Sequence, residues 1–191
     1  MATIEEIDHA VDAAREGGCE DITLLRTNSS YPALTAEMDL RAISVMADRW
    51  RLPVGLSDHT LGSISAVVAT ALGATVFEKH LTLKRSDGGP DALFSAEPSE
   101  LTSYVQDVRD AYASIGGERF GPSPREAASI KLRPSLRAVE SIRRGEVITH
   151  RNVKSVRPAG GLAPQEISKI VGRLPSRSIA QGEPISWDLL D

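Results

Sequence analysis

Alternation between two kinds of segment is the feature that most constrains how this chain folds. Over the first 117 residues, segments with apolar residues at helical spacing alternate with short apolar runs bounded by Gly, Pro and polar residues. Helices are expected over residues 3–16, 40–50, 64–72 and 98–115, and strands over residues 22–25, 53–56 and 75–81. This order is typical of a parallel α/β sheet, either open or closed into a barrel. The sequence therefore predicts an α/β fold for this region.

Polar side chains follow each of the three expected strands. Ser29 and Tyr31 come after the first strand, Ser57 and His59 after the second, and His80 lies near the end of the third. In open sheets and in barrels of this class, ligands bind at the carboxyl ends of the parallel strands. We therefore expect these side chains to face one common site.

The two histidines of this group are candidates for a metal centre. His59 and His80 lie at equivalent heights on neighbouring expected strands, so their imidazoles could share one divalent ion that keeps open positions for substrate oxygens. An ion with only two protein ligands suits Mn or Mg better than structural zinc. A pair of histidines hydrogen-bonded within loops explains the same spacing, and both interpretations stay open at this point.

Three carboxylates lie close to the histidines in sequence. Asp58 and Glu78 each lie beside or near a histidine, and neighbours in a strand point to opposite faces, so they are expected to orient an imidazole rather than to bind the ion. Plain salt bridging is an equal alternative for both. Asp91 lies on a loop long enough to reach back over the strand ends, where its carboxylate could accept hydrogen bonds from a hydroxylated substrate; a turn-forming Asp is the alternative.

Charge and composition exclude several classes of function. The formal net charge is -4 and the Lys and Arg residues are scattered, so neither nucleic acid nor an anionic membrane is an expected partner. A single cysteine rules out an internal disulfide, and no stretch is apolar enough for a signal sequence or a membrane span, which makes the cytoplasm the expected compartment. No Gly-rich phosphate loop, nucleophile elbow or Cys–His pairing is present.

A second domain is expected towards the C-terminus. Residues 119–133 loosen into Gly, Pro, Ser and charged residues, which indicates a linker with one helical turn. Beyond it, residues 142–149 recur in altered form as residues 179–186, each copy with a Gly-Glu turn, and one helix is expected between them at 164–171. The predicted organisation is an α/β domain at 1–117, a linker at 118–134 and a small β-rich domain at 135–191.

Taken together, these segments resemble the sialic acid synthase family, whose members condense phosphoenolpyruvate with an N-acetylated amino sugar. The resemblance lies in four motifs, Ser57-Asp58-His59-Thr60-Leu61-Gly62, Ala71-Leu72-Gly73-Ala74, Glu78-Lys79-His80 and Gly89-Pro90-Asp91. Residues 86–91 and Phe94-Ser95 are more similar to the pseudaminic acid synthase branch than to the N-acetylneuraminate branch. Residues 135–191 resemble the family's antifreeze-like SAF domain, which is of β-clip type.

The resemblance also implies that part of the family's fold lies outside this sequence. Residues 1–3 resemble the middle of a segment that precedes the sixth barrel strand. The chain would then hold about three β/α units, the C-terminal portion of a (β/α)8 TIM-type barrel, followed by the SAF domain. The family's catalytic carboxylate and the lysines that hold phosphoenolpyruvate would come from earlier strands. We therefore expect the chain to be N-terminally truncated and inactive alone.

Roles for individual residues follow from the resemblance. It implies that His59 and His80 are the metal ligands and the catalytic centre. The residues implied to bind substrate are Ser29 and Ser57 for phosphoenolpyruvate, Tyr31 as pocket wall, Asp91 for a sugar hydroxyl, and Arg157, which would reach from the SAF domain into the active site of the partner in a homodimer.

The expected function is therefore that of a nonulosonic (sialic or pseudaminic) acid synthase. The reaction would be a metal-assisted, aldol-type formation of a carbon–carbon bond with release of phosphate. Two alternatives stay open: the C-terminal half of a split synthase that a separate polypeptide completes, and a non-catalytic sugar-binding module that contains an SAF domain.

Overall fold

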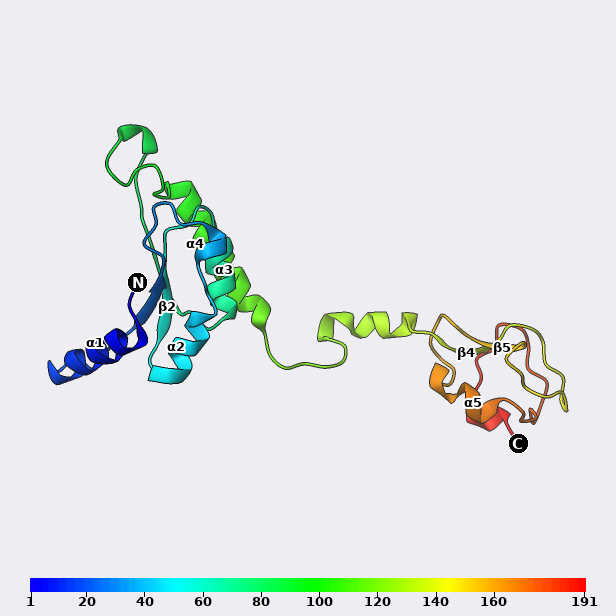
Figure 1. Ribbon diagram of the computed structural model, residues 1–191. Helices are drawn as coiled ribbons and strands as arrows, with labels where there is room; N and C mark the ends of the chain where they lie inside the picture. The colour runs from blue at the N-terminus through cyan, green and yellow to red at the C-terminus, as the bar shows by residue number, and fades with distance from the viewer. The chain divides into compact units, whose positions relative to one another are not determined.

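The computed structural model describes all residues, 1–191, and the chain forms two compact units, 1–118 and 119–191 (Figure 1). The helices are α1 (Ile4–Glu16), α2 (Ala42–Trp50), α3 (Ile64–Ala71), α4 (Pro98–Ile115) and α5 (Ile167–Ile170). The strands are β1 (Leu24–Thr27), β2 (Val54–Asp58), β3 (Val76–Lys79), β4 (Ser135–Ala138) and β5 (Val153–Val156). Short 3-10 helices are η1 (Thr35–Glu37), η2 (Arg85–Asp87), η3 (Pro124–Leu132), η4 (Pro164–Glu166) and η5 (Trp187–Leu189).

The first unit is built on a parallel sheet with the strand order β1-β2-β3. Helices α2, α3 and α4 lie on one side of this sheet (Figure 1). There the buried side chains of Val54 and Leu56 from β2 pack with Ile43 of α2, Ala66 of α3 and Tyr104 of α4. The alternation of helices and parallel strands predicted from the sequence is therefore confirmed.

The opposite face of the sheet carries a different set of residues. Strand pairing aligns Thr27 with Ser57 and Ser57 with Glu78, and side-chain alternation turns these residues away from the face on which Leu56 lies. Helices α2, α3 and α4 do not cover this face, and Val76 remains 42% exposed. In a closed barrel, the corresponding face points to the interior.

The first strand lies two residues later than its apolar run predicts. Pairing with β2 begins at Leu24, and β1 therefore includes the polar residues Arg26 and Thr27. Arg26 is only partly exposed because its Nε donates a hydrogen bond to the carbonyl oxygen of Met38, at 2.9 Å. A polar side chain with such a partner is compatible with a strand, which hydrophobicity alone does not indicate.

Helix α1 begins with a capping box. Thr3 Oγ1 accepts a hydrogen bond from the backbone N–H of Glu6 (3.2 Å), and the Glu6 carboxylate accepts one from the N–H of Thr3 (2.7 Å). The helix ends before Gly17, as predicted. Asp8 of this helix accepts hydrogen bonds from Arg49 and from the indole N–H of Trp50, which fastens α1 to the end of α2.

The second unit is small and rich in extended chain. Strands β4 and β5 pair antiparallel, and the isolated bridge between Ile142 and Ile179 joins the two copies of the near-repeat. The core consists of fully or nearly fully buried aliphatic side chains, among them Leu136, Ile148 and Ile185. The unit therefore has a hydrophobic core of its own.

Both copies of the near-repeat form the expected turn. In the first, the carboxylate of Glu146 accepts a hydrogen bond from the N–H of Arg143; in the second, Glu183 accepts one from the N–H of Ala180. Each glycine of the Gly-Glu pair has a positive φ, which favours glycine. The segment expected as a linker with one turn contains instead the nine-residue η3, which a capping box between Ser123 and Glu126 begins.

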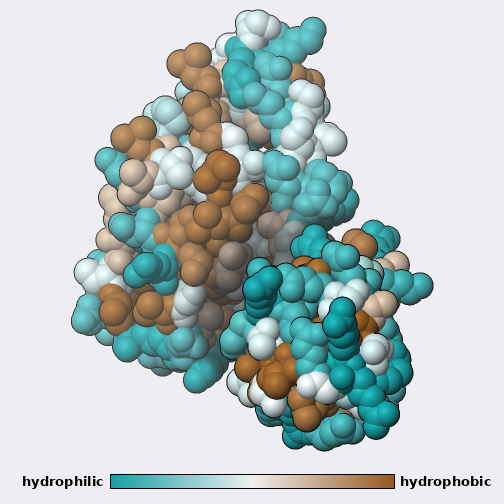
Figure 2. Space-filling view, turned by 90° about the vertical axis from the view of Figure 1, so that its right-hand side faces the viewer, coloured by the Kyte–Doolittle hydropathy of each residue, from teal (hydrophilic) through white to brown (hydrophobic).

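Apolar side chains also lie on the outer surface of the first unit. Ile64 and Val68, one turn apart on α3, are 64% and 43% exposed, and Tyr112 of α4 is 72% exposed. Figure 2 shows apolar side chains gathered on this face. No helix of the chain combines the length and the apolar character that crossing a membrane requires.

Candidate functional site

The structure brings the two predicted histidines together. The ring centroids of His59 and His80 are 5.2 Å apart, with the ring planes at 64°. Asp58 and Lys79 are partners in the parallel pairing and are the last residues of β2 and β3, so the histidines that follow them lie at the same level. Alternation places both imidazoles on the side of the sheet opposite to the helices.

The His59 ring has a defined orientation. Its Nδ1 lies 2.7 Å from the backbone carbonyl oxygen of Asn28, in the loop that follows β1, and the residue is 7% exposed. A carbonyl oxygen can only accept, so Nδ1 carries a proton, and in the neutral form of the ring the lone pair is then on Nε2. A hydrogen bond of this kind on one ring nitrogen is typical of imidazoles that bind a metal through the other.

His80 has a carboxylate beside it. Its Nδ1 is 3.6 Å from Asp91 Oδ2, a distance that indicates electrostatic attraction when the imidazole is protonated. Asp91 is delivered by the long loop between β3 and α4, as the sequence predicts. Both side chains are partly open to solvent, and a hydroxylated ligand can reach the Asp91 carboxylate.

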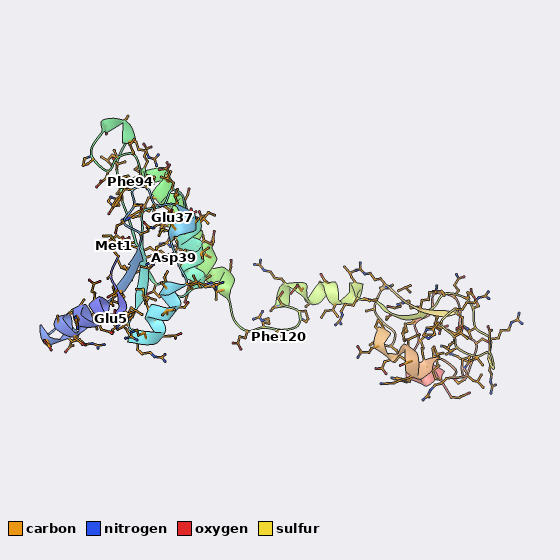
Figure 3. All side chains as sticks on the ribbon, in the orientation of Figure 1. Met1, Glu5, Glu37, Asp39, Phe94 and Phe120 are labelled. Carbon is orange, nitrogen blue, oxygen red and sulfur yellow. The ribbon has the colours of Figure 1, made fainter.

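Two aromatic rings close around the histidines. The Tyr31 ring lies 4.4 Å from His59 and 5.8 Å from His80, between ring centroids. The centroid of the Phe94 ring lies 5.1 Å from that of His80 and 5.0 Å from that of Tyr31. Figure 3 labels Phe94 near the end of the first unit from which the loop after β3 projects. Phe94 is buried while Tyr31 is 53% exposed, so the cluster is shielded on one side and open on the other.

The histidine pair fits a divalent cation with few protein ligands. Two imidazoles on one ion, each at a bond length of about 2.1 Å, have ring centres roughly 5 Å apart, close to the separation found here. No group of three or more His, Cys, Asp and Glu side chains is arranged to hold an ion. His59 and His80 would therefore supply two ligands, and water or substrate oxygens the others, which suits Mn or Mg.

The two serines predicted to bind phosphoenolpyruvate have different surroundings. Ser57 lies on the same face of the sheet as the imidazoles, two residues before His59, and its hydroxyl donates a 2.6 Å hydrogen bond to Glu78 Oε1. In the same row, Thr27 Oγ1 is buried without a hydrogen-bond partner. Ser29 is exposed in the loop after β1.

The predicted orientation of the imidazoles by Asp58 and Glu78 is not what the structure shows. The Asp58 carboxylate binds Lys79 and Thr60 on the helix-covered side of the sheet, and the Glu78 carboxylate binds Ser57. Asp58 does not orient the His59 ring because side chains alternate along β2, which turns the Asp58 carboxylate to the face opposite to His59. Asp58 instead forms a salt bridge with Lys79, which is the alternative left open for these residues.

Arg157 belongs to the second unit. It is exposed, and its guanidinium makes no hydrogen bond or salt bridge within the chain. The carbonyl oxygen of the next residue, Pro158, accepts hydrogen bonds from Ser135 and Arg137, which anchors the loop that presents Arg157.

A pocket of about 510 Å³ lies on the helix side of the sheet, next to the histidine cluster and not within it. Its lining comes from the loop after β2, the loop after β3 and helix α4. The charged side chains in it have partners: Arg85 binds Glu100, Lys79 binds Asp58, and Asp107 accepts a hydrogen bond from Ser63. Phe94 forms a wall of this pocket and also packs on His80.

Three contributors to the site were not predicted in these roles. Asn28 acts through its backbone carbonyl, which no side-chain pattern indicates. Phe94 reaches His80 through a loop whose path the sequence does not determine. The pairing of Lys79 with Asp58 had a detectable signal, because each residue directly precedes a histidine on neighbouring strands and must point to the opposite face.

A parallel α/β unit with histidines at its strand ends, followed by a small β-rich unit, is the architecture of a C-terminal barrel portion joined to an SAF domain. The chain belongs to the NeuB family: the NeuB family model matches residues 1–119, and the SAF domain model matches residues 133–191. The resemblance drawn from the sequence motifs is thereby confirmed.

Several curated relatives with similar sequences are legionaminic, pseudaminic and N-acetylneuraminate-9-phosphate synthases. The chain is 35% identical to N,N'-diacetyllegionaminic acid synthase of Legionella pneumophila, over 100% of the chain and 55% of the relative. It is 33% identical to pseudaminic acid synthase of Campylobacter jejuni (97% and 54%) and 31% identical to human N-acetylneuraminate-9-phosphate synthase (100% and 53%). The chain thus spans about half the length of these relatives.

Solved structures have a similar fold. A spore coat polysaccharide biosynthesis protein E from Chromobacterium violaceum superimposes with a TM-score of 0.62 at 29% identity, over 100% of this chain and 58% of that one. An N-acetylneuraminic acid synthetase from Leptospira borgpetersenii, in complex with citrate, superimposes with a TM-score of 0.60 at 32% identity, over 68% and 45%. The fold is therefore the C-terminal portion of a (β/α)8-type barrel followed by an SAF domain.

Proposed function

We propose that this chain forms the sugar and metal side of a nonulosonic acid synthase, which condenses phosphoenolpyruvate with an N-acetylated amino sugar. The observation that carries the proposal is the histidine pair, 5.2 Å apart, with the Nδ1 proton of His59 held by Asn28. The names of the relatives support the class of product, since they are legionaminic, pseudaminic and N-acetylneuraminate-9-phosphate synthases.

In the proposed reaction, C3 of phosphoenolpyruvate bonds to the aldehyde carbon of the open-chain sugar, water adds at C2, and phosphate leaves. A Mn or Mg ion bound at the site would supply Lewis acidity towards the aldehyde oxygen. His59 and His80 would hold that ion through their unprotonated ring nitrogens. Asp91 would accept hydrogen bonds from sugar hydroxyls, and Tyr31 would form the pocket wall. Ser57 and Ser29 would contact phosphoenolpyruvate.

Activity by this chain alone is not expected under this proposal. The relatives are almost twice as long, and the face of the sheet that carries Ser57, His59 and His80 is not covered by the helices of this chain. Groups that activate phosphoenolpyruvate would come from barrel elements in the part of the relatives that this chain does not match. The synthase would therefore need those elements, either in the same polypeptide or in a separate one.

A homodimer in which the SAF domain covers the partner's site is part of the proposal. Residues 1–118 contain 9 Lys and Arg against 19 Asp and Glu, whereas residues 119–191 contain 13 against 7. Opposite net charges favour association between the two kinds of unit. The exposed Arg157 would then be available to a carboxylate or phosphate of the bound substrates.

Metal binding is the direct test. Mn²⁺ is titrated into the full chain and free ion is followed by electron paramagnetic resonance. One ion per chain is expected, and His59→Ala and His80→Ala are each expected to abolish it. His9→Ala and His150→Ala, at the two other histidines, are the matched controls and should bind as the parent chain does. Equal affinity in all four variants would refute the metal site.

Calorimetry with an N-acetylated amino sugar separates the synthase proposal from a sugar-binding module. The synthase predicts sugar binding that strengthens when Mn²⁺ is present and weakens in Asp91→Asn. Binding of the same strength with and without the ion would favour the module. Release of phosphate from phosphoenolpyruvate by this chain unaided would overturn the expectation that it is inactive alone.

A further inference from the structure

A buried ion pair lies directly behind the two histidines. Lys79 Nζ is 3.1 Å from Asp58 Oδ2, and the two side chains are 6% and 0% exposed. Each of these residues directly precedes one of the histidines, and the two are partners in the pairing of β2 with β3. The ion pair therefore joins the strands at the level where the imidazoles leave them, on the opposite face of the sheet.

The ion pair also binds Thr60, the residue that follows His59 in the chain. Asp58 Oδ1 accepts hydrogen bonds from the Thr60 N–H (2.9 Å) and the Thr60 hydroxyl (2.7 Å). Lys79 Nζ donates to the Thr60 carbonyl oxygen. The residues before and after His59 are thus both bound to one ammonium group of β3, and the ring of Tyr104 covers that group from α4, with its centroid 5.1 Å from Nζ.

Stability alone does not account for this arrangement. A buried ion pair usually contributes no more to stability than apolar side chains of similar volume would. Apolar side chains, however, could not bind the N–H, hydroxyl and carbonyl groups of Thr60. The directed contacts are therefore suited to fixing where the backbone at His59 lies relative to His80.

We propose that Asp58 and Lys79 are positioning residues that fix the separation of His59 and His80 and thereby set the affinity of the site for a divalent cation. The inference rests on the proposed function, since it concerns the same histidines. Neither residue contacts an imidazole, and both act through the backbone of β2 and β3. Outer contacts that orient metal ligands commonly change metal affinity about 10–100-fold.

The test uses the full chain with Lys79→Met and with the double variant D58L/K79M. Mn²⁺ affinity is measured by electron paramagnetic resonance, and the melting midpoint is measured alongside. Both variants are expected to raise the dissociation constant about 10–100-fold, even where the apolar double variant melts as the parent chain does. Ile43→Val, a fully buried core position on α2, is the control: it should lower the melting midpoint and leave the dissociation constant unchanged.

A second measurement is independent of the ion. The nuclear Overhauser effect between the His59 and His80 rings in the metal-free chain reports their separation. It should weaken in D58L/K79M and persist in Ile43→Val. If Lys79→Met does not fold, the double variant decides. The inference would be overturned if the double variant had a dissociation constant within twofold of the parent value and an unchanged nuclear Overhauser effect between the two rings. If the parent chain binds no Mn²⁺, the proposed metal site fails, and the ring-to-ring effect alone decides on positioning.

Discussion

Gly161 offers a sharp test of how the second unit is packed. A Cβ at this position would lie 2.4 Å from the Leu136 carbonyl oxygen and 3.0 Å from that of Ile185. Both oxygens are engaged: Leu136 accepts from the N–H of Ile185 (2.9 Å), and Ile185 accepts from the N–H of Leu162 (2.7 Å). A methyl group would therefore enter the place where three backbone segments exchange hydrogen bonds.

The expected cost of Gly161→Ala follows from these contacts. Overpacking of a tight site costs about 1–3 kcal/mol, and one weakened backbone hydrogen bond adds about 1 kcal/mol. We expect a loss of about 2–4 kcal/mol, against a total of roughly 4–11 kcal/mol for a unit of this size. In a domain of this length, such a loss lowers the melting midpoint by about 10–25 °C.

Trp187 is a natural probe for this experiment. The chain has two tryptophans, and Trp187 lies in the second unit, so its fluorescence in a Trp50→Phe background reports urea unfolding of that unit. Gly182→Ala is the comparison variant, because Gly182 has a φ of 85° but no atom near its missing Cβ, which isolates backbone strain of about 1–2 kcal/mol. If Gly161→Ala costs less than Gly182→Ala, the close packing described for Gly161 is wrong.

Three further predictions concern other parts of the chain. Tyr104→Phe removes a buried hydroxyl that has no hydrogen-bond partner, and should leave the stability of the first unit unchanged or raise it by up to about 1 kcal/mol in urea unfolding. Hydrogen bonds from Arg177 and from a backbone N–H hold the pKa of Glu183 below its usual 4.5. The ionised Glu183 carboxylate therefore contributes fully to stability above pH 4.5, and this contribution is lost as the pH falls through the lowered pKa. Glu183→Gln should remove this part of the acid sensitivity, which is measured by unfolding below and above pH 4.5. Thr3→Ala removes the cap of α1 and should cost about 1 kcal/mol, with faster amide exchange confined to the first turn, whereas Thr3→Ser should retain the cap.

Much of the fold was predictable because its signals are local. The capping box of α1, the glycines that follow helices and the paired Gly-Glu turns each depend on residues a few positions apart. The site was predictable as far as parallel strands align their ends: His59 and His80 lie close together because β2 and β3 pair in parallel and in register. That the two histidines lie near each other follows from the order of the elements, whereas their equal height requires the register of β2 against β3.

The remaining features depend on contacts between distant segments. Phe94 meets Tyr31 because the loop after β3 folds back, and the path of a loop is not encoded in a local pattern. The hydrogen bond from Ser57 to Glu78 and the bond from Lys79 to Asp58 require the register of β2 against β3 as well as the direction of each side chain. An alternation argument gives the direction, and the register comes only from the three-dimensional structure.

The two Gly-Glu turns of the second unit are bound to each other in a reciprocal way. Ile142 and Ile179 exchange both backbone hydrogen bonds, and each turn also donates one N–H to a serine hydroxyl near the other, from Arg144 to Ser178 and from Gln181 to Ser141. Opening either half would therefore leave the other without partners. The amide protons of both halves should exchange with solvent at one common free energy, as a single cooperative unit, and neither half should hold its fold when expressed as a separate peptide.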